Sequence, residues 1–265
     1  MRVAIGVSYD GSVFEGWQSQ PSGNTVQDQL ERALGGIACH PVRIAGAGRT
    51  DAGVHATAQV AHFDTDADRE AQAWVRGTNS RLPDAIAVQW ATVVDDEFHA
   101  RFSARARSYR YLLYNHPVRP SVLAGRCGWH HARLDERAMG EALQSVLGEH
   151  DFSAFRAAEC QAKTPVRTVE AATVVRQGDW ICFEFTANAF LHHMVRNLVG
   201  CLVYVGSGRQ PPAWMGQVLG SRDRRQAAPT FAAGGLYLSG VRYEPQWVLP
   251  GFPAQLPSFT QGAPS

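Results

Sequence analysis

Lysine is almost absent from this sequence, and so are the marks of membrane and disulfide-rich proteins. Lys163 is the single lysine among the 25 lysine and arginine residues. No run of about 18 apolar residues occurs, which argues against a membrane-spanning helix. The five cysteines are scattered and form no Cys-x-x-Cys pair, which argues against a disulfide framework and a zinc ribbon. We therefore expect buried free thiols.

Apolar residues are numerous enough for one or two packed domains. They make up 45% of the 265 residues, while charged residues make up 18%, a mixture typical of globular proteins. Residues 1–9 alternate like a strand and lack the apolar core and cleavage site of a secretory leader. This pattern favours a cytoplasmic location.

Acidic residues are missing from one long stretch, residues 98–134. Ordinary surfaces mix both signs of charge, and a guanidinium can fork onto phosphate oxygens or stack on bases. The stretch therefore favours binding to a polyanion such as RNA, with solvated surface arginines as the alternative. Its basic residues are Arg101, Arg105, Arg107, Arg110, Arg119, Arg126 and Arg133.

The first hundred residues are predicted to fold in the order β-α-β-β-α-β. Apolar residues at helical spacing after Asn24 or Thr25, either of which can cap a helix, indicate a helix to about Ile37. A second helix is expected from Asp66 or Asp68 to about Asn79. Alternation indicates strands at 3–9, 42–47, 59–63 and 86–94. This order is that of a split βαβ unit with helices on one sheet face.

The second half has a similar order of elements but no detectable sequence repeat. Two alternating runs, 168–175 and 180–186, are separated by three turn residues and indicate a hairpin. A long helix with one apolar stripe is expected from Phe190 to Val205. A helix is expected near 135–147, and further strands at 107–114 and 235–243. Residues 246–265 are rich in Pro, Gly, Ser and Gln and are predicted to be extended or disordered.

The segment GRTDAGVH, Gly48–His55, packs a cation, a hydroxyl, a carboxylate and two glycines between two predicted strands. Glycines allow a sharp turn and close approach of a ligand to the main chain. In a generic loop, an aspartate satisfied by its own turn would be the favoured interpretation. This octapeptide, however, resembles residue for residue the signature of the bacterial tRNA pseudouridine synthase A family, in which the aspartate is catalytic. The resemblance implies that Asp51 is the catalytic residue.

Four more segments resemble family segments and follow the family's order. The resemblance covers roughly residues 1–245 and leaves the Pro-rich tail outside. The scarcity of lysine indicates that phosphate contacts of relatives need not map onto this chain. The segments are FHARFSARARSYRYLLYN (98–115), DFSAFR (151–156), NAFLHHMVRN (188–197) and GLYL (235–238).

The resemblance implies an α+β fold of two ferredoxin-like halves, with mostly antiparallel sheets, helices on one side and an active-site cleft between the halves. Residues 1–105 would carry the aspartate loop. Residues 106–245 would carry a base-stacking tyrosine and an aspartate-pairing arginine, and residues 246–265 would be a tail.

The family reaction converts uridine to pseudouridine without net oxidation or hydrolysis, so no cofactor is expected. A carboxylate can act as a nucleophile or as a proton acceptor at the sugar, and a nearby cation would favour its ionised form. The resemblance implies that this cation is Arg196, and the alternative is that Arg196 is simply solvated. It also implies that Tyr109 stacks on the target base, and the alternative is that Tyr109 is an ordinary core aromatic. Leu236 would close the pocket, and Arg49 would contact phosphate or fill the space left by the base. Phosphate contacts are also expected of Arg101, Arg105, Arg107 and Arg110.

Family resemblance also implies a homodimer that binds the tRNA anticodon stem-loop and modifies uridines 38 to 40. A metal site is not expected, because the adjacent histidine pairs 130–131 and 192–193 point to different faces and no HExxH motif occurs. A noncatalytic RNA-recognition module is the alternative from a different class, since its βαβ order is similar. An N-glycosidase is a third, but it would commonly need two placed carboxyl groups.

Overall fold

The structure is a computed structural model that describes residues 1–259, and the chain divides into two compact units. Unit 1 comprises Met1–Arg107 and Tyr237–Leu256, and unit 2 comprises Ser108–Leu236 and, of the described residues after it, 257–259. The chain passes from unit 1 to unit 2 after Arg107, two residues after the expected boundary at 105. It returns to unit 1 after Leu236, nine residues before the expected end of the second half at 245, so the last strand belongs mainly to unit 1.

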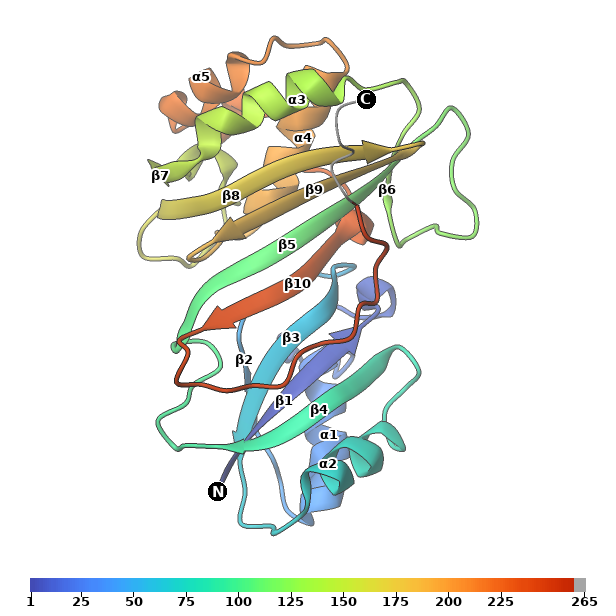
Figure 1. Cartoon of the computed structure of the whole chain (residues 1–265), viewed down its shortest axis with the longest axis vertical. Coiled ribbons are helices and arrows are strands. Elements are labelled where there is room, and N and C mark those ends of the chain that lie inside the picture. The colour runs from blue at the N-terminus through green and yellow to red at the C-terminus, as the bar shows by residue number, and fades with distance from the viewer. Residues whose placement is uncertain (260–265) are drawn as a thin grey trace. The chain divides into compact units, whose positions relative to one another are not determined.

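Unit 1 has the strand order of a split βαβ fold (Figure 1). Its sheet runs β4-β1-β3-β10, and β2 also pairs with β3. Neighbouring strands are antiparallel, except that β10 is parallel to β3. The elements are β1 (Arg2–Tyr9), η1 (Gly11–Val13), α1 (Val26–Ala38), β2 (Ile44–Gly46), β3 (His55–Asp64), α2 (Ala71–Asn79), β4 (Ile86–Val94) and β10 (Leu236–Tyr243). The predicted order of the first hundred residues is therefore confirmed.

The two helices of unit 1 begin for different reasons. Thr25 caps α1 by accepting a hydrogen bond from the amide of Asp28, as one of the two predicted caps. The predicted start of α2 at Asp66 or Asp68 is wrong, because the helix begins after Glu70, which makes no side-chain cap. Apolar side chains then decide its position, since the indole of Trp74 is buried edge-on against Phe63 of β3.

The sheet face of unit 1 opposite α1 and α2 is covered by the chain after β10 (Figure 1). Trp247, Leu249 and Phe252 pack against a buried cluster that includes Trp90 and Phe98. The predicted tail is therefore irregular, but from 247 to 252 it is packed instead of disordered, because these large apolar side chains find an uncovered sheet face. Residues 260–265 of the predicted tail lie outside the described residues.

Unit 2 also consists of a sheet with helices on one face, but its strands and helices differ in length from those of unit 1. Its strands are ordered β5-β9-β8-β7, with β6 parallel to β5, and α3, α4 and α5 gather on one face of the sheet (Figure 1). The predicted hairpin is confirmed as β8 and β9. The elements are β5 (Ala104–Asn115), β6 (Gly128–His130), α3 (Glu136–Leu143), η2 (Gln144–Val146), β7 (Gly148–Asp151), η3 (Ser153–Phe155), β8 (Val166–Gln177), β9 (Trp180–Ala187), α4 (Met194–Gly206), α5 (Trp214–Ser221), η4 (Arg224–Gln226) and η5 (Ala233–Gly235).

The long helix of unit 2 begins four residues later than predicted. The N-cap of α4, His193, is in the left-handed region with φ of 63°, which breaks a helix that would otherwise start at Phe190. The apolar stripe is confirmed, since Leu198 and Leu202 are fully buried. Sequence patterns did not predict α5, β6 or β7.

The cysteines are free, but only some of them are buried as expected. Burial raises the pKa of the Cys182 thiol to about 12 and that of Cys201 to about 11. Cys39 is exposed at the left-handed C-cap of α1. Within the described residues, none of the helices is long and apolar enough to cross a membrane.

Candidate active site

The GRTDAGVH segment forms the connection between β2 and β3, and Asp51 begins a tight turn in it. The amide of Val54 donates to the carbonyl of Asp51 at 3.1 Å, which closes the turn. Gly53 has a φ of 78°, a conformation that glycine adopts without strain. Asp51 is half-buried and Ala52 is exposed. The turn therefore presents a carboxylate at the edge of a rigid backbone.

The residue before Asp51 fixes the turn from one side. Thr50 is buried, and its hydroxyl shares a hydrogen bond of 2.8 Å with the hydroxyl of Tyr9. Its carbonyl accepts from the amide of Trp17 at 3.0 Å. A Cβ at Gly16 would lie 2.7 Å from the same carbonyl, so the neighbouring chain can approach only as glycine. These contacts leave Asp51 little backbone freedom.

Two buried polar side chains of β3 fix the rest of the segment. Gln59 is fully buried, and its amide both donates to the carbonyl of Gly48 at 2.7 Å and accepts from the Gly48 amide at 3.4 Å. His55 accepts from the amide of Gly11 at 3.0 Å and stacks on the ring of Tyr237 at 4.6 Å. Asp10 lies 3.1 Å from the same His55 nitrogen. Sequence reasoning missed the roles of Gln59 and His55, although a glutamine inside an apolar strand indicates a buried hydrogen-bond partner.

Arg49, predicted to contact RNA, is exposed on the same segment two residues before Asp51. It lies next to the buried Thr50, so the chain alternates an outward guanidinium with an inward hydroxyl. Of the predicted site residues in unit 1, Arg49 and Asp51 lie on this segment, and Arg107 donates to the carbonyl of Ala47 just before it.

The predicted base-stacking tyrosine belongs to unit 2. Tyr109 of β5 is buried, and its ring meets that of Phe190 edge-on at 5.1 Å. Tyr111, two residues on, is fully buried and donates its hydroxyl to the carbonyl of Ala232 at 2.8 Å. Leu236, predicted to close the pocket, is buried at the start of β10. A core role accounts for Tyr111, which has no exposed surface, whereas Tyr109 is 8% exposed.

Arg196 lies in the first turn of α4 and is half-buried. Its Nε donates to the carbonyl of Phe231 at 2.9 Å, so it is not simply solvated. Next to it, the fully buried Asn197 donates to the carbonyl of Phe155 at 2.7 Å and accepts from Thr230 at 2.7 Å. Asn197 therefore joins the DFSAFR and NAFLHHMVRN segments, a role that sequence reasoning missed.

The arginines predicted to contact phosphate have protein partners. Arg105 pairs with Glu244 at 2.5 Å, and Arg110 pairs with Glu184 at 2.6 Å. The guanidinium of Arg107 donates to backbone carbonyls, including that of Ala47. Arg101 is exposed, and its guanidinium lies over the ring of Phe102. Exposed ion pairs are worth little, so those at Arg105 and Arg110 can open for a ligand.

Known proteins resemble this chain over nearly its whole length. A family model described as tRNA pseudouridine synthase matches residues 5–103 and 142–244. The tRNA pseudouridine synthase A of Aromatoleum aromaticum is 62% identical over 251 residues, covering 95% of each chain. Those of Paraburkholderia xenovorans and Dechloromonas aromatica are 62% and 60% identical, covering 94% of this chain and 92% and 95% of theirs.

Among solved structures, a chain of a Cbf5-Nop10-Gar1 complex is similar with a TM-score of 0.41 and 12% identity, covering 91% of this chain and 50% of that one. This similarity is too low to carry an argument. The sequence relatives and the family model are decisive, because they cover both units and include the Asp51 turn. The chain belongs to the tRNA pseudouridine synthase family.

Proposed function

We propose that this protein isomerises uridine to pseudouridine at positions 38 to 40 of the tRNA anticodon stem-loop. One observation carries the proposal: in a member of this family, the single carboxylate of the GRTDAGVH segment is half-buried on a turn fixed from both sides. A preorganised carboxylate is what a reaction at one sugar carbon requires.

Asp51 is the proposed catalytic residue. The reaction breaks the bond between the sugar and N1, turns the base and rejoins it through C5, which loses its hydrogen as a proton while N1 takes up a proton. No heavy atom is lost and no electrons are gained or lost, so no cofactor is needed. The carboxylate either attacks the sugar or removes a sugar proton, and both roles require its ionised form. We assign to Arg196 the task of favouring that form. Its half-buried guanidinium is held at Nε by the Phe231 carbonyl, which supports a fixed rather than a solvated cation.

The other predicted residues would bind the extruded nucleotide. A stacked base leaves its glycosidic bond out of reach, so the uridine must be flipped into a pocket. Tyr109 would stack on the uracil, and Leu236 would add apolar surface. Arg49 would contact the backbone phosphate or fill the space that the base leaves, which its exposure next to the Asp51 turn supports. Arg101, Arg105, Arg107 and Arg110 would contribute positive potential toward phosphates.

We further propose a homodimer that acts in the cytoplasm. Family resemblance supports both points. Sedimentation velocity of the purified protein tests the first: a monomer that still modifies tRNA would contradict it.

A noncatalytic RNA-recognition module is not favoured. Such modules stack bases on an open sheet face. In unit 1 the face opposite the helices is occupied by Trp247, Leu249 and Phe252 of the chain itself. The family assignment likewise points to an isomerase.

Release of tritium from tRNA labelled at uracil C5 tests the activity. The wild type should release tritium without liberating free uracil, which excludes an N-glycosidase. Asp51→Asn should release none, because the amide can neither attack nor accept a proton, while its affinity for tRNA stays within about two-fold. The matched control is Asp66→Asn, an exposed carboxylate of the same unit. Normal turnover by Asp51→Asn would contradict the proposed role.

The substrate position is tested in cells. Pseudouridine is mapped in tRNA from cells that lack the protein, before and after it is restored. Loss confined to positions 38 to 40, reversed by the wild type and not by Asp51→Asn, is the expected result. Loss elsewhere in tRNA would overturn the proposed position.

A further inference from the structure

A short turn of unit 1 holds an aromatic side chain out into solvent. The turn comprises residues 98–103, between β4 and β5, and Phe102 in it is 76% exposed. A phenylalanine so exposed contributes little to the core, and its burial against a partner would be favourable. Its neighbour Phe98, by contrast, is fully buried.

Hydrogen bonds from backbone amides, most of them to the side chains of His99 and Ser103, order this turn. The amide of His99 donates to the Ser103 hydroxyl at 3.0 Å, and the amide of Ser103 donates to the carbonyl of His99 at 2.9 Å. The ring Nδ1 of His99 accepts from the amides of Arg101 and Phe102 at 3.1 and 3.3 Å. The exposed ring is therefore attached to an ordered turn rather than to a loose loop.

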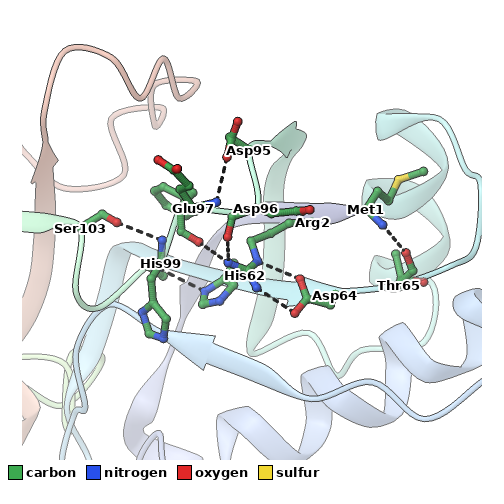
Figure 2. Close-up of polar contacts among 12 residues, drawn as sticks. Met1, Arg2, His62, Asp64, Thr65, Asp95, Asp96, Glu97, His99 and Ser103 are labelled. Atoms are coloured by element: carbon green, nitrogen blue, oxygen red, sulfur yellow. Dashed lines mark hydrogen bonds and ion pairs between the residues drawn. The ribbon is translucent and has the colours of Figure 1, made fainter.

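Polar side chains of β1 and β3 anchor the turn to the sheet (Figure 2). Arg2 of β1 pairs with Asp64 at 2.8 Å and donates to the carbonyls of Asp96 and Phe98. His62 of β3 accepts from the amide of Ala100 at 3.2 Å. Burial, with the positive charge of Arg2 nearby, lowers the pKa of His62 to about 4, so at neutral pH its ring is an acceptor, as this bond needs.

Around Phe102 the exposed surface is aromatic and basic. Its ring lies 4.3 Å from that of His99, and the Arg101 guanidinium lies 5.7 Å from its centre. Three acids, Asp95, Asp96 and Glu97, precede the turn. In Figure 2 the carboxylates of Asp95 and Glu97 point away from the His99 ring.

One side chain ties this turn to the Asp51 segment within unit 1. The guanidinium of Arg107 donates to the carbonyl of Arg101 at 2.6 Å and to the carbonyl of Ala47 at 2.9 Å. Ala47 directly precedes Gly48, the first residue of the GRTDAGVH segment. A ligand that contacts Phe102 would thereby be held at a fixed position relative to the Asp51 turn.

We propose that Phe102 and Arg101 form a positioning contact for the tRNA substrate, in which the phenyl ring stacks on a base or ribose next to the modified stem and the guanidinium contacts a phosphate. Every base has an aromatic face, so such stacking tolerates several sequences. The acid-free composition of residues 98–134 fits a polyanion better than a protein partner. This inference rests on the proposed function and adds residues that act through binding instead of chemistry.

The test measures the Kd for tRNA by fluorescence anisotropy and single-turnover pseudouridine formation at saturating enzyme. Phe102→Ala and Phe102→Leu should raise the Kd about five-fold or more, and Phe102→Trp should restore it. The rate at saturation should stay within about two-fold of the wild type, because the chemistry is untouched. Arg101→Ala should lower the slope of log Kd against log salt by about one.

Val93→Ala is the matched control, since Val93 is 61% exposed on β4 of the same unit, and it should not change the Kd. Wild-type affinity of Phe102→Leu, or a Phe102→Trp that binds as weakly as Phe102→Ala, would overturn the stacking contact. A changed sedimentation coefficient with an unchanged Kd would overturn it in favour of contact with a second copy of the chain. Failure of the proposed function would instead appear as wild-type protein that binds tRNA without forming pseudouridine.

Discussion

The two units hold their predicted site residues by different means. In unit 1, Asp51 lies on an irregular segment that hydrogen-bonds to Trp17 and Gln59 through its backbone and to Tyr9 through the Thr50 hydroxyl. In unit 2, Arg196 is carried by a regular helix, and the buried Asn197 beside it fixes that helix to two other segments. A short irregular motif needs many small restraints, whereas a helix needs one well-placed anchor. Substitutions should therefore affect the two units unequally.

The largest expected effect is in unit 2, for Asn197→Leu. The change leaves the Phe155 carbonyl, the Thr230 hydroxyl and one Arg224 nitrogen without their common partner in a buried site. Unfolding free energy should fall by about 3 kcal/mol, since each unsatisfied buried group costs roughly 1–3 kcal/mol. Urea denaturation followed by circular dichroism measures the loss.

The control for this prediction is Gln217→Leu on α5, where the side chain is exposed. It should change stability by less than about 0.5 kcal/mol. A comparable loss in both variants would mean that Asn197 is not a specific anchor, and the contrast between the units would fail.

A smaller effect is expected in unit 1 for Gln59→Leu. The substitution removes two hydrogen bonds to the Gly48 backbone, and we expect a loss of about 2 kcal/mol. Because the restraint is local, the Gly48 amide should also exchange hydrogen faster than amides of β1. Gln89→Leu on β4, which loses one bond to the Ser8 hydroxyl, should cost less than about 1 kcal/mol. Equal losses at the two glutamines would show that the segment is held by its other contacts alone.

The smallest expected effect is a dependence of the unfolding free energy on pH, which arises from a buried histidine of unit 1. The pKa of His62 is lowered from 6.5 to about 4 in the folded protein, chiefly by burial. Between these values the unfolded chain binds the proton and the folded one does not, so stability should fall as pH drops from about 6.5 toward 4. From pH 7 to pH 5 the loss should be roughly 1–2 kcal/mol.

His62→Asn should flatten that dependence, since the amide oxygen can accept from Ala100 without titrating. The neighbouring ionisable groups are Arg2, Asp64 and His99, and they are unchanged in this variant. Urea denaturation at pH 7 and pH 5 gives the comparison, with the exposed His131→Asn as control. An unaltered slope in His62→Asn would show that another group causes the loss.

Elements with a clear period were predictable from local sequence. The strand Ile86–Val94, the helix capped by Thr25 and the hairpin of β8 and β9 appear as expected. The α2 start, the α4 start and the packing of residues 247–252 were not predicted correctly. Two of these depend on a distant sheet face, which Trp74 and Trp247 pack against, and the third depends on the left-handed backbone of His193, which apolar periodicity does not reveal.

By itself the sequence determined the order of elements in the first hundred residues, the Asp51 turn and the family, because periodicity, glycine placement and a complete motif are local properties of the chain. Only the tertiary structure decided which polar groups hold that turn, since Gln59, His55 and Arg107 act on partners 11 to 60 residues away. It also decided that Phe102 stays exposed while Phe98 is buried. The two phenylalanines belong to one segment, and nothing local distinguishes them, because burial is set by what the rest of the chain brings to each side of the turn.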